Sequence, residues 1–303
     1  MGIEPPAAPP ADSALPGRCP ALGDVTAVIV SYNSAHCVPA LAAQLADWPH
    51  VIVADNGSSD ATATVLRQQL PQAQVLELGE NRGFGAANNA ALARVSTPYA
   101  LLINPDCELH AAQALALLAC MAQWPQAAIV VPQLVDGRGQ PQLNYGWLRR
   151  QWAARGPGAE GLACVGNACG AAMLLRLSAL PTRDWFDTRF FLYYEDEDLC
   201  LRLLQAGKPV LIEPAVRVAH ANRGSVRGPR PLRVEWGRGY HHARSKILFT
   251  AKHHGPQPAA RQRRQALAGA LALLLLRLLA PSPKHVARLW GRIQGLWSAP
   301  VHY

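Results

Sequence analysis

The sequence contains no hydrophobic run long enough to cross a membrane. Its best candidate, residues 266–276 (ALAGALALLLL), ends after 11 residues at Arg277, whereas a membrane-spanning helix needs about 20. The Pro- and Ala-rich residues 1–23 lack the basic-then-apolar order of a secretory signal and are predicted to form a disordered leader. Seven cysteines include no CxxC pair, which favours reduced thiols in a cytoplasmic protein over a disulfide framework or a zinc site.

Acidic residues are almost missing from the last part of the chain. Residues 221–303 hold 15 Lys and Arg against the single acid Glu235, whereas the first 220 residues hold 14 against 19 acids. This imbalance predicts a basic helical tail over 257–303 that meets an anionic partner, such as phosphate, nucleic acid or a membrane surface. Residues 266–276 fit either a helix lying in a membrane interface or a buried core helix.

Hydrophobic periodicity in the first half alternates between strand and helix. Apolar runs occupy residues 25–33, 50–60, 73–81 and 99–107, and the patterns between them, at 38–48, 61–70 and 83–95, are helical. This order is typical of an α/β fold, a mostly parallel central sheet with helices on both faces. One domain is expected over 24–256, with a nucleotide-binding half at 24–110 and an acceptor-binding half at 111–256.

Polar side chains follow all four of these strands. Because ligands of such sheets bind beyond the carboxyl ends of the strands, we expect a binding site formed by these residues: Ser31, Tyr32, Asn33, Asp55, Asn56, Gly57, Asn81, Arg82, Gly83, Asn104 and Asp106. Asp106 can hold a Mg²⁺ or Mn²⁺ ion that carries a diphosphate, or it can form a turn. Asp55 can accept hydrogen bonds from a nucleobase or ribose, or form an Asx turn.

The segment GFGAAN, residues 83–88, nearly matches a dinucleotide-binding fingerprint. Asn88 replaces the third glycine, and the segment follows the third strand instead of the first. An NAD(P)-dependent oxidoreductase is therefore a disfavoured alternative. Gly83 and Gly85 mark a close approach of the backbone to a ligand or to a neighbouring element.

Four consecutive acids, residues 195–198, lie behind two aromatic pairs in FFLYYEDEDLCLRL. A helix is expected from this point to Gly207, and its first turn favours acids. Four acids exceed that need. Crowding beside aromatic rings is expected to raise the pKa of the carboxyl groups and make Asp196 a better base, whereas Glu197 and Asp198 cap the helix.

Six segments in this order resemble the family 2 inverting glycosyltransferases of GT-A fold: VIVSYNS, ADNGSSD, ENRGFGAANN, LLINPD, GAAMLLR and FFLYYEDEDLCLRL. The resemblance covers about residues 24–255 and is closest to the rhamnosyltransferase-like branch. It implies that the strand ends, with Gly85 and Asn88, hold a nucleotide-sugar. It also implies that Asp106 belongs to the metal-binding DxD motif, whose first position here is Asn104. Glu195 and Asp196 match the pair that supplies the base, and His220 completes the metal site.

The resemblance further implies transfer of a sugar, L-rhamnose from a dTDP donor, to a hydroxyl of a cell-surface glycan or lipid-linked acceptor. The acceptor-binding residues expected are Gly170, Ala171, Trp185 and Tyr194, and Arg223 or Arg227 would contact the diphosphate. We expect a protein on the inner face of the plasma membrane, with no nucleic-acid partner. Adjacent Glu195 and Asp196 do not suit a glycoside hydrolase, whose carboxylates flank the bond. A non-enzymatic binding module would explain only the tail.

Overall fold

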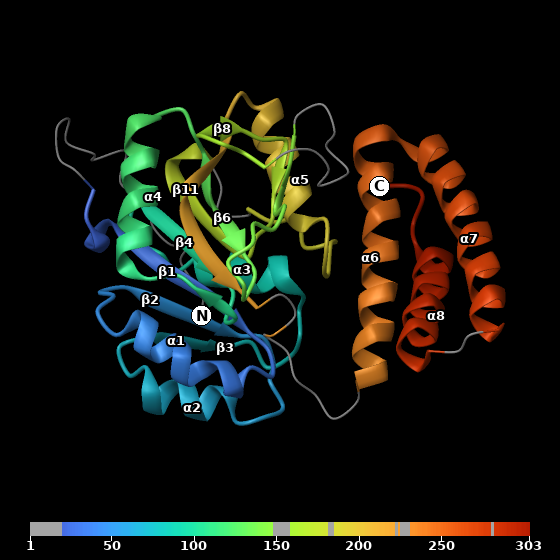
Figure 1. Cartoon of the computed structure of the whole chain (residues 1–303), viewed down its shortest axis with the longest axis horizontal. Helices are drawn as coiled ribbons and strands as arrows, with labels where there is room; N and C mark the ends of the chain where they lie inside the picture. The colour runs from blue at the N-terminus through green and yellow to red at the C-terminus, as the bar shows by residue number, and fades with distance from the viewer. Residues whose placement is uncertain (1–19, 148–157, 181–184, 222–223, 225–230, 280–281) are drawn as a thin grey trace, which may run out of the picture.

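The computed structural model describes residues 20–147, 158–180, 185–221, 224, 231–279 and 282–303, and the side chains of all these except 278 and 279. An α/β body is followed by three long C-terminal helices that lie together on one side of it (Figure 1). Most of the expected leader, Arg223 and Arg227 lie outside the described residues. Among those described, no helix is both long enough and apolar enough to span a bilayer.

The central sheet runs in the order β3-β2-β1-β4-β10-β6-β11-β5, and β8 pairs with β11. Its first four strands are parallel, as predicted, whereas β10 is antiparallel to both of its neighbours, so the sheet is mixed. The strands are β1 (Val25–Ser31), β2 (Val51–Asp55), β3 (Gln74–Glu77), β4 (Tyr99–Ile103), β5 (Cys107–Glu108), β6 (Ile129–Val135), β8 (Ala163–Cys164), β10 (Ala172–Arg176) and β11 (Val210–His220). A two-stranded sheet joins β7 (Tyr145–Gly146) and β9 (Asn167–Ala168).

Helices cover both faces of the sheet because strand residues alternate between two hydrophobic cores. Val25, Ala27 and Ile29 pack with α1, α2 and α4, whereas Val28 packs with α3 and α5. The helices of the body are α1 (Val38–Leu45), α2 (Thr62–Gln69), α3 (Phe84–Leu92), α4 (Ala111–Gln123) and α5 (Glu195–Gln205). As predicted, Gly207 ends α5, with the positive φ of 71° that a helix C-terminus favours.

The C-terminal helices are α6 (Pro231–His254), α7 (Pro256–Leu279) and α8 (Pro283–Ser298). They share a small core in which Ile247 of α6 and Ile293 of α8 are buried. Helix α6 also packs on the body, because Leu248 and Phe249 bury Phe190. The boundary expected after residue 256 therefore falls between two helices of one packed unit.

The leucine-rich segment of α7 was expected to be either a buried core helix or a helix that lies in a membrane interface, and its two faces differ in this respect. Ala266, Leu267, Ala270 and Leu274 pack toward α6 and α8. Leu271, Leu273, Leu275 and Leu276 are exposed on the same helix. One face is thus part of the core of the C-terminal unit, and the remaining leucines are open to a partner.

Candidate active site

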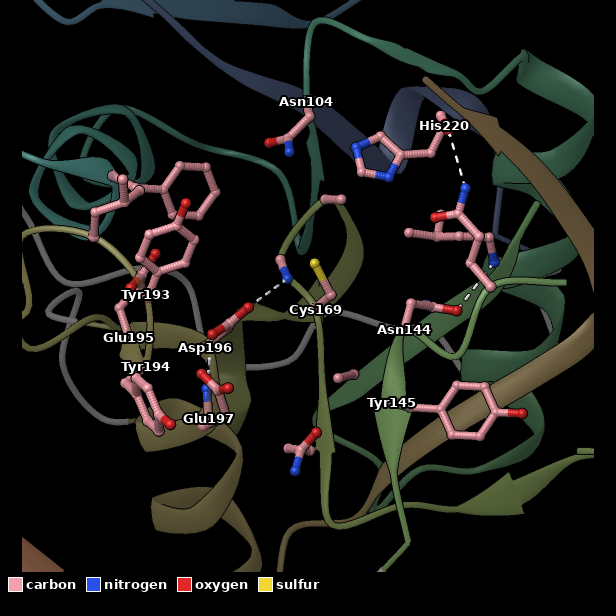
Figure 2. Close-up of a pocket in the computed structure, with 18 of the residues that line it drawn as sticks. Asn104, Asn144, Tyr145, Cys169, Tyr193, Tyr194, Glu195, Asp196, Glu197 and His220 are labelled. Atoms are coloured by element: carbon pink, nitrogen blue, oxygen red, sulfur yellow. Dashed lines mark hydrogen bonds between the residues drawn. The ribbon is translucent and has the colours of Figure 1, made fainter. Parts of the chain in front are cut away.

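A cavity of about 450 Å³ opens beyond the carboxyl end of β4, where β10 and α5 both begin. Asn104 and His220 lie on one side of it, and Tyr193, Tyr194 and Asp196 lie on the other (Figure 2). The pairing of β10 with β4 creates part of this arrangement. The backbone N–H of Asn104 donates to the carbonyl of Ala171 across 2.8 Å, which places the start of β10 beside the end of β4.

Asp196 presents a fixed carboxylate to the cavity. Its Oδ2 accepts a hydrogen bond from the backbone N–H of Gly170 at 3.0 Å, and its Oδ1 accepts one from the N–H of Glu197, also at 3.0 Å (Figure 2). Both donors belong to the backbone, so uncharged partners keep the carboxylate in its orientation. Glu195, the other candidate, also lines the cavity but is only 4% exposed.

The backbone is strained immediately before these acids. Tyr193 and Tyr194 have φ angles of 67° and 70°, a left-handed conformation that costs a bulky residue about 1–3 kcal/mol. Tyr194 occupies the N-cap of α5, and no side chain caps the helix. The double turn explains the aromatic lead-in, because it brings both tyrosine rings against His242 of α6 at the cavity wall.

The crowding of the carboxylates affects Glu195 and Glu197. Burial raises the pKa of Glu195 well above its usual value, and the charge of Asp196 raises it further. Burial likewise raises the pKa of Glu197 well above its usual value, followed by the effects of Asp196 and Glu195. The expected rise in pKa is therefore found in the two glutamates that flank Asp196.

Asp198 does not cap the helix, contrary to the prediction. Its carboxylate is fully buried and accepts hydrogen bonds from Arg202, Lys252 and His253. The prediction failed because two of these partners lie on α6, more than fifty residues away. Asp198 instead joins the helix that carries Asp196 to α6.

Asp106 and His220 meet because β5 pairs with the end of β11, with Cys107 opposite His220. His220 Nε2 lies 3.5 Å from Asp106 Oδ1. The other carboxylate oxygen, Oδ2, accepts a 2.9 Å hydrogen bond from the N–H of Gly224. Ligand atoms of Asp106, Cys107 and His220 all lie within 4.8 Å of one another, close enough to share one metal ion.

The donor set fits a divalent metal at two of these three residues. A carboxylate and an imidazole are normal ligands of Mn²⁺, and the Nδ1 atom of His220 is buried with no hydrogen-bond partner. The Cys107 thiol is buried and donates to the carbonyl of Ala171, so it is directed away from that role. Asp106 and His220 are thus the residues that would hold the ion.

The predicted nucleotide-binding residues meet in two hydrogen-bonded loops. Asp55 is buried and accepts from Ser31 Oγ at 3.3 Å and, three residues further along its own loop, from the N–H of Ser58 at 3.1 Å. Asn33 accepts from the N–H of Ser59, and Tyr32 precedes it.

In the second loop, Asn56 forms hydrogen bonds with Asn81, Arg82 and Gly83, whereas Gly57 packs against the same segment. The contact of both loops with a nucleotide stays a prediction.

The glycines of the GFGAAN segment serve chain packing. A Cβ on Gly83 would lie 2.3 Å from the carbonyl oxygen of Phe191, and one on Gly85 would lie 2.8 Å from Cβ of Phe186. Asn88 is buried and donates to the carbonyl of Phe84 within its own helix. Gly85 thus packs against the segment that carries the acids, and Asn88 is bonded within its own helix, whereas their contact with a nucleotide-sugar stays a prediction.

Three of the four predicted acceptor-binding residues, Gly170, Ala171 and Tyr194, line the cavity. Trp185 does not. It is fully buried in the core beneath α5, so its ring cannot stack on a sugar, and this prediction is wrong. The error came from reading an aromatic residue near the acids as exposed.

Residues 26–179 match the family model of glycosyl transferase family 2. The chain belongs to this family. It is 30% identical over 255 residues to an N-acetylglucosaminyl-diphospho-decaprenol L-rhamnosyltransferase of Mycobacterium tuberculosis, covering 74% of this chain and 81% of the relative. The fold agrees with that of solved glycosyltransferases.

Two of these solved structures cover 90% of the chain. A mannosyltransferase from Pyrobaculum calidifontis in complex with GDP-Man and Mn²⁺ gives a TM-score of 0.57 at 17% identity, with 87% of that chain covered. TarS of S. aureus in complex with UDP gives 0.51 at 14% identity, with 90% of that chain covered. The expected GT-A architecture is thereby confirmed.

Several residues of this glycosyltransferase that line the cavity were missed by sequence reasoning. Gln142 and Asn144 precede β7, Tyr145 and Asn167 begin the two-residue strands β7 and β9, and His242 comes from α6. Polar residues in loops and two-residue strands carry no periodicity, so no sequence signal singles them out. The two adjacent histidines in α6 were a usable signal.

Proposed function

We propose that this glycosyltransferase moves L-rhamnose from dTDP-rhamnose to a hydroxyl of a glycan or lipid-linked saccharide, with inversion at the anomeric carbon. The carboxylate of Asp196 carries the proposal. It is held by two backbone N–H groups on the cavity wall across from Asn104 and His220. A carboxylate fixed on one side of a sugar-sized cavity, facing a potential metal site on the other, suits a single displacement.

In this mechanism the acceptor hydroxyl oxygen attacks the anomeric carbon, and its proton passes to Asp196. The bond from the anomeric carbon to the diphosphate oxygen breaks at the same time, and the diphosphate leaves with the electron pair. The N–H groups of Gly170 and Glu197 keep the carboxylate oriented during the attack. Glu195, buried and with a raised pKa, supports the start of α5 and does not take the proton.

Asp106 and His220 would hold a Mg²⁺ or Mn²⁺ ion at the other side of the cavity. Such an ion, when bound, offsets the charge that develops on the departing diphosphate. Asn104 lines the same side and offers a neutral amide to the phosphates or the sugar. The solved mannosyltransferase that shares the fold contains Mn²⁺ with its nucleotide-sugar, which supports a metal in this role.

The choice of donor and acceptor rests on the mycobacterial relative, which is named an L-rhamnosyltransferase acting on N-acetylglucosaminyl-diphospho-decaprenol. The exposed leucines of α7 support a site of action at the inner face of the plasma membrane, with anionic lipid as a partner. Nucleic acid is not an expected partner, because four arginines of the basic C-terminal helices line a small cavity and are not spread over one surface.

A donor screen tests the proposal. The full chain is incubated with Mn²⁺, a lipid-linked N-acetylglucosamine and dTDP-rhamnose, UDP-N-acetylglucosamine or GDP-mannose in turn, and products are measured by mass spectrometry. We expect a deoxyhexose to be added from dTDP-rhamnose, and NMR should show the opposite anomeric configuration to that of the donor. Transfer from another donor alone would overturn the choice of sugar. Retained configuration would overturn the mechanism.

A further inference from the structure

A second cavity, of about 290 Å³, lies among the three C-terminal helices. Four arginines line it: Arg238 of α6, Arg277 of α7, and Arg288 and Arg292 of α8. The scarcity of acids in this part of the sequence thus concentrates positive charge around one cavity that is open to solvent at Leu273 and Arg277. Leu273 and Leu289 form the apolar part of its wall.

Glycines bring α6 and α8 into backbone contact at this place. A Cβ on Gly239 would lie 2.0 Å from the carbonyl oxygen of Arg288, and one on Gly291 would lie 2.0 Å from that of Trp236. Larger residues would separate the helices. Because Arg288 and Arg292 are one helical turn apart, the close crossing directs both toward the same side of α6.

The positive charge in this cavity is only partly balanced. Arg238 pairs with Glu235, with 2.6 Å between Nη1 and Oε1. Among the described residues, no carboxylate forms an ion pair with Arg277, Arg288 or Arg292. Converging guanidinium groups repel one another, so an anion bound among them would be stabilised by all of them. Guanidinium groups match phosphate oxygens in both charge and geometry.

The arginine cavity adjoins the catalytic cavity. His242 lines both, and its ring contacts those of Tyr193 and Tyr194 at centroid distances of 5.5 and 5.6 Å. The two cavities therefore lie on either side of one histidine side chain. The contact is made at the Tyr193 and Tyr194 side of the active site, away from His220, near which the diphosphate of the donor is expected (Figure 2).

Exposed leucines continue from the arginine cavity along α7. Leu273 lines the cavity, and Leu275 and Leu276 immediately before Arg277 are 67% and 61% exposed. An apolar surface that begins at a phosphate-sized basic cavity matches a ligand with a hydrocarbon chain attached to phosphate.

We propose that the arginine cavity binds the diphosphate of an isoprenoid-diphosphate-linked acceptor. The isoprenoid chain runs along the exposed leucines of α7, and the sugar at the other end of the diphosphate passes His242 to reach Asp196. The proposal rests on the proposed function, because it takes Asp196 to act on the acceptor. It assigns to Arg277, Arg288 and Arg292 a recognition role that the donor does not share.

Direct binding tests this site without any turnover. Farnesyl diphosphate is titrated into the full chain by calorimetry, beside farnesol, which lacks phosphate, and phosphatidylglycerol vesicles, which present a lipid headgroup. We expect farnesyl diphosphate to bind and farnesol to bind at least tenfold more weakly. The R288Q/R292Q double variant should bind farnesyl diphosphate at least about tenfold more weakly, because it loses charge-assisted hydrogen bonds.

The matched control is R261Q/R264Q, which removes the same charge from exposed positions of α7 outside the cavity and should bind normally. R277Q, an exposed change, serves as a second cavity variant if the double variant melts at a lower temperature. Equal binding of farnesyl diphosphate by wild type and the cavity variants, or no binding by wild type, overturns the proposal. A cavity variant that loses vesicle binding but keeps farnesyl diphosphate binding shows a membrane headgroup site and also overturns it.

Kinetics separates this proposal from the proposed function. With a soluble alkyl glycoside of N-acetylglucosamine as acceptor, R288Q/R292Q should turn over like wild type. With the diphosphate-linked acceptor, its KM should rise at least tenfold. If no donor and acceptor react at all, the proposed function fails, whereas the binding result still decides the arginine cavity.

Discussion

Asp198 of α5 and His253 of α6 lie 2.7 Å apart, measured from Oδ1 to Nε2. The same carboxylate oxygen lies 2.7 Å from Lys252 Nζ, and its partner oxygen accepts a 2.8 Å hydrogen bond from Arg202 Nε. Burial acts to raise the pKa of Asp198, but the bonds from His253, Lys252 and Arg202 outweigh it and lower the pKa below the usual 3.8. The contact fixes α5, the helix that carries the proposed base Asp196, to the C-terminal unit.

We expect Asp198→Asn to reduce the free energy of unfolding by about 3 kcal/mol at pH 7, because Arg202 and His253 lose their carboxylate partner, although Lys252 keeps its ion pair with Asp187. A lowered pKa in the folded state adds stability above the unfolded value of about 3.8, and this stability is lost as the pH falls below it. The difference between wild type and variant in urea unfolding should therefore shrink from pH 7 to pH 3. Asp47→Asn, at an exposed position, is the control. A constant difference would contradict the assignment.

Asp196→Asn should lower the rate of sugar transfer by about 10²–10⁴-fold, the usual cost of losing a general base. The amide keeps the size of the side chain, so affinity for dTDP should stay close to that of wild type. Single-turnover kinetics and calorimetry measure the two effects. Wild-type turnover by this variant would exclude Asp196 as the base.

Glu195→Gln should keep most of the transfer rate, because its side chain is only 4% exposed at the cavity wall and the proposed base is Asp196. The raised pKa of Glu195 means that the folded protein retains a proton that the unfolded chain loses above about pH 4.5. Wild-type stability is therefore reduced as the pH rises above that value, and the glutamine variant escapes this loss. The melting temperature of the variant minus that of wild type should therefore increase from pH 4 to pH 8. A difference that does not change with pH would refute the buried, protonated state of Glu195.

Asp106→Ala and His220→Ala should each reduce the part of dTDP affinity that depends on Mn²⁺, since each removes one ligand of the proposed ion. Calorimetry with dTDP, with and without Mn²⁺, is the measurement. Cys107→Ala is the matched control and should retain the metal dependence, because its thiol is bonded to the carbonyl of Ala171. If His220→Ala binds like the control, His220 has a structural role.

Replacing both Leu275 and Leu276 by Gln should weaken co-sedimentation of the full chain with anionic vesicles. The two side chains are among the most exposed leucines of α7, and each fully buried leucine contributes about 1.5–3 kcal/mol. Binding should also fall with salt, because each Lys or Arg near the surface adds about 1 kcal/mol that salt screens. Leu115→Gln on α4 is the control. Negligible binding by wild type would mean that these leucines face another partner.

The parallel half of the fold could be predicted because β1, β2 and β4 are buried on both faces, whereas the edge strand β3 is only partly buried. Buried strands form continuous apolar runs, and β3, with Val75 and Leu76 between two exposed polar residues, also lies within a predicted segment, as β1, β2 and β4 do. The insertion of β10, antiparallel to its neighbours, could not be predicted, because strand direction depends on contacts between distant segments.

The candidate site was predicted where residues close in sequence act together, as at Asp196 and its neighbours. It was missed where packing decides. Trp185 is an amphipathic residue whose burial depends on α5 settling onto the sheet. The sequence of α6 interrupts its apolar positions with glycines and histidines, so its contribution through His242 and Lys252 could not be read from periodicity.

Helix α6 contacts Asp198 near its C-terminal end through Lys252 and His253, and it borders both cavities at His242. The three C-terminal helices are consequently not an interchangeable module. A chimaera made to change the acceptor would have to transfer α6 with α7 and α8 and still present two cations to Asp198. Exchange of α7 and α8 alone would keep the contacts between Asp198 and α6, but it would remove Arg277, Arg288 and Arg292 from the arginine cavity.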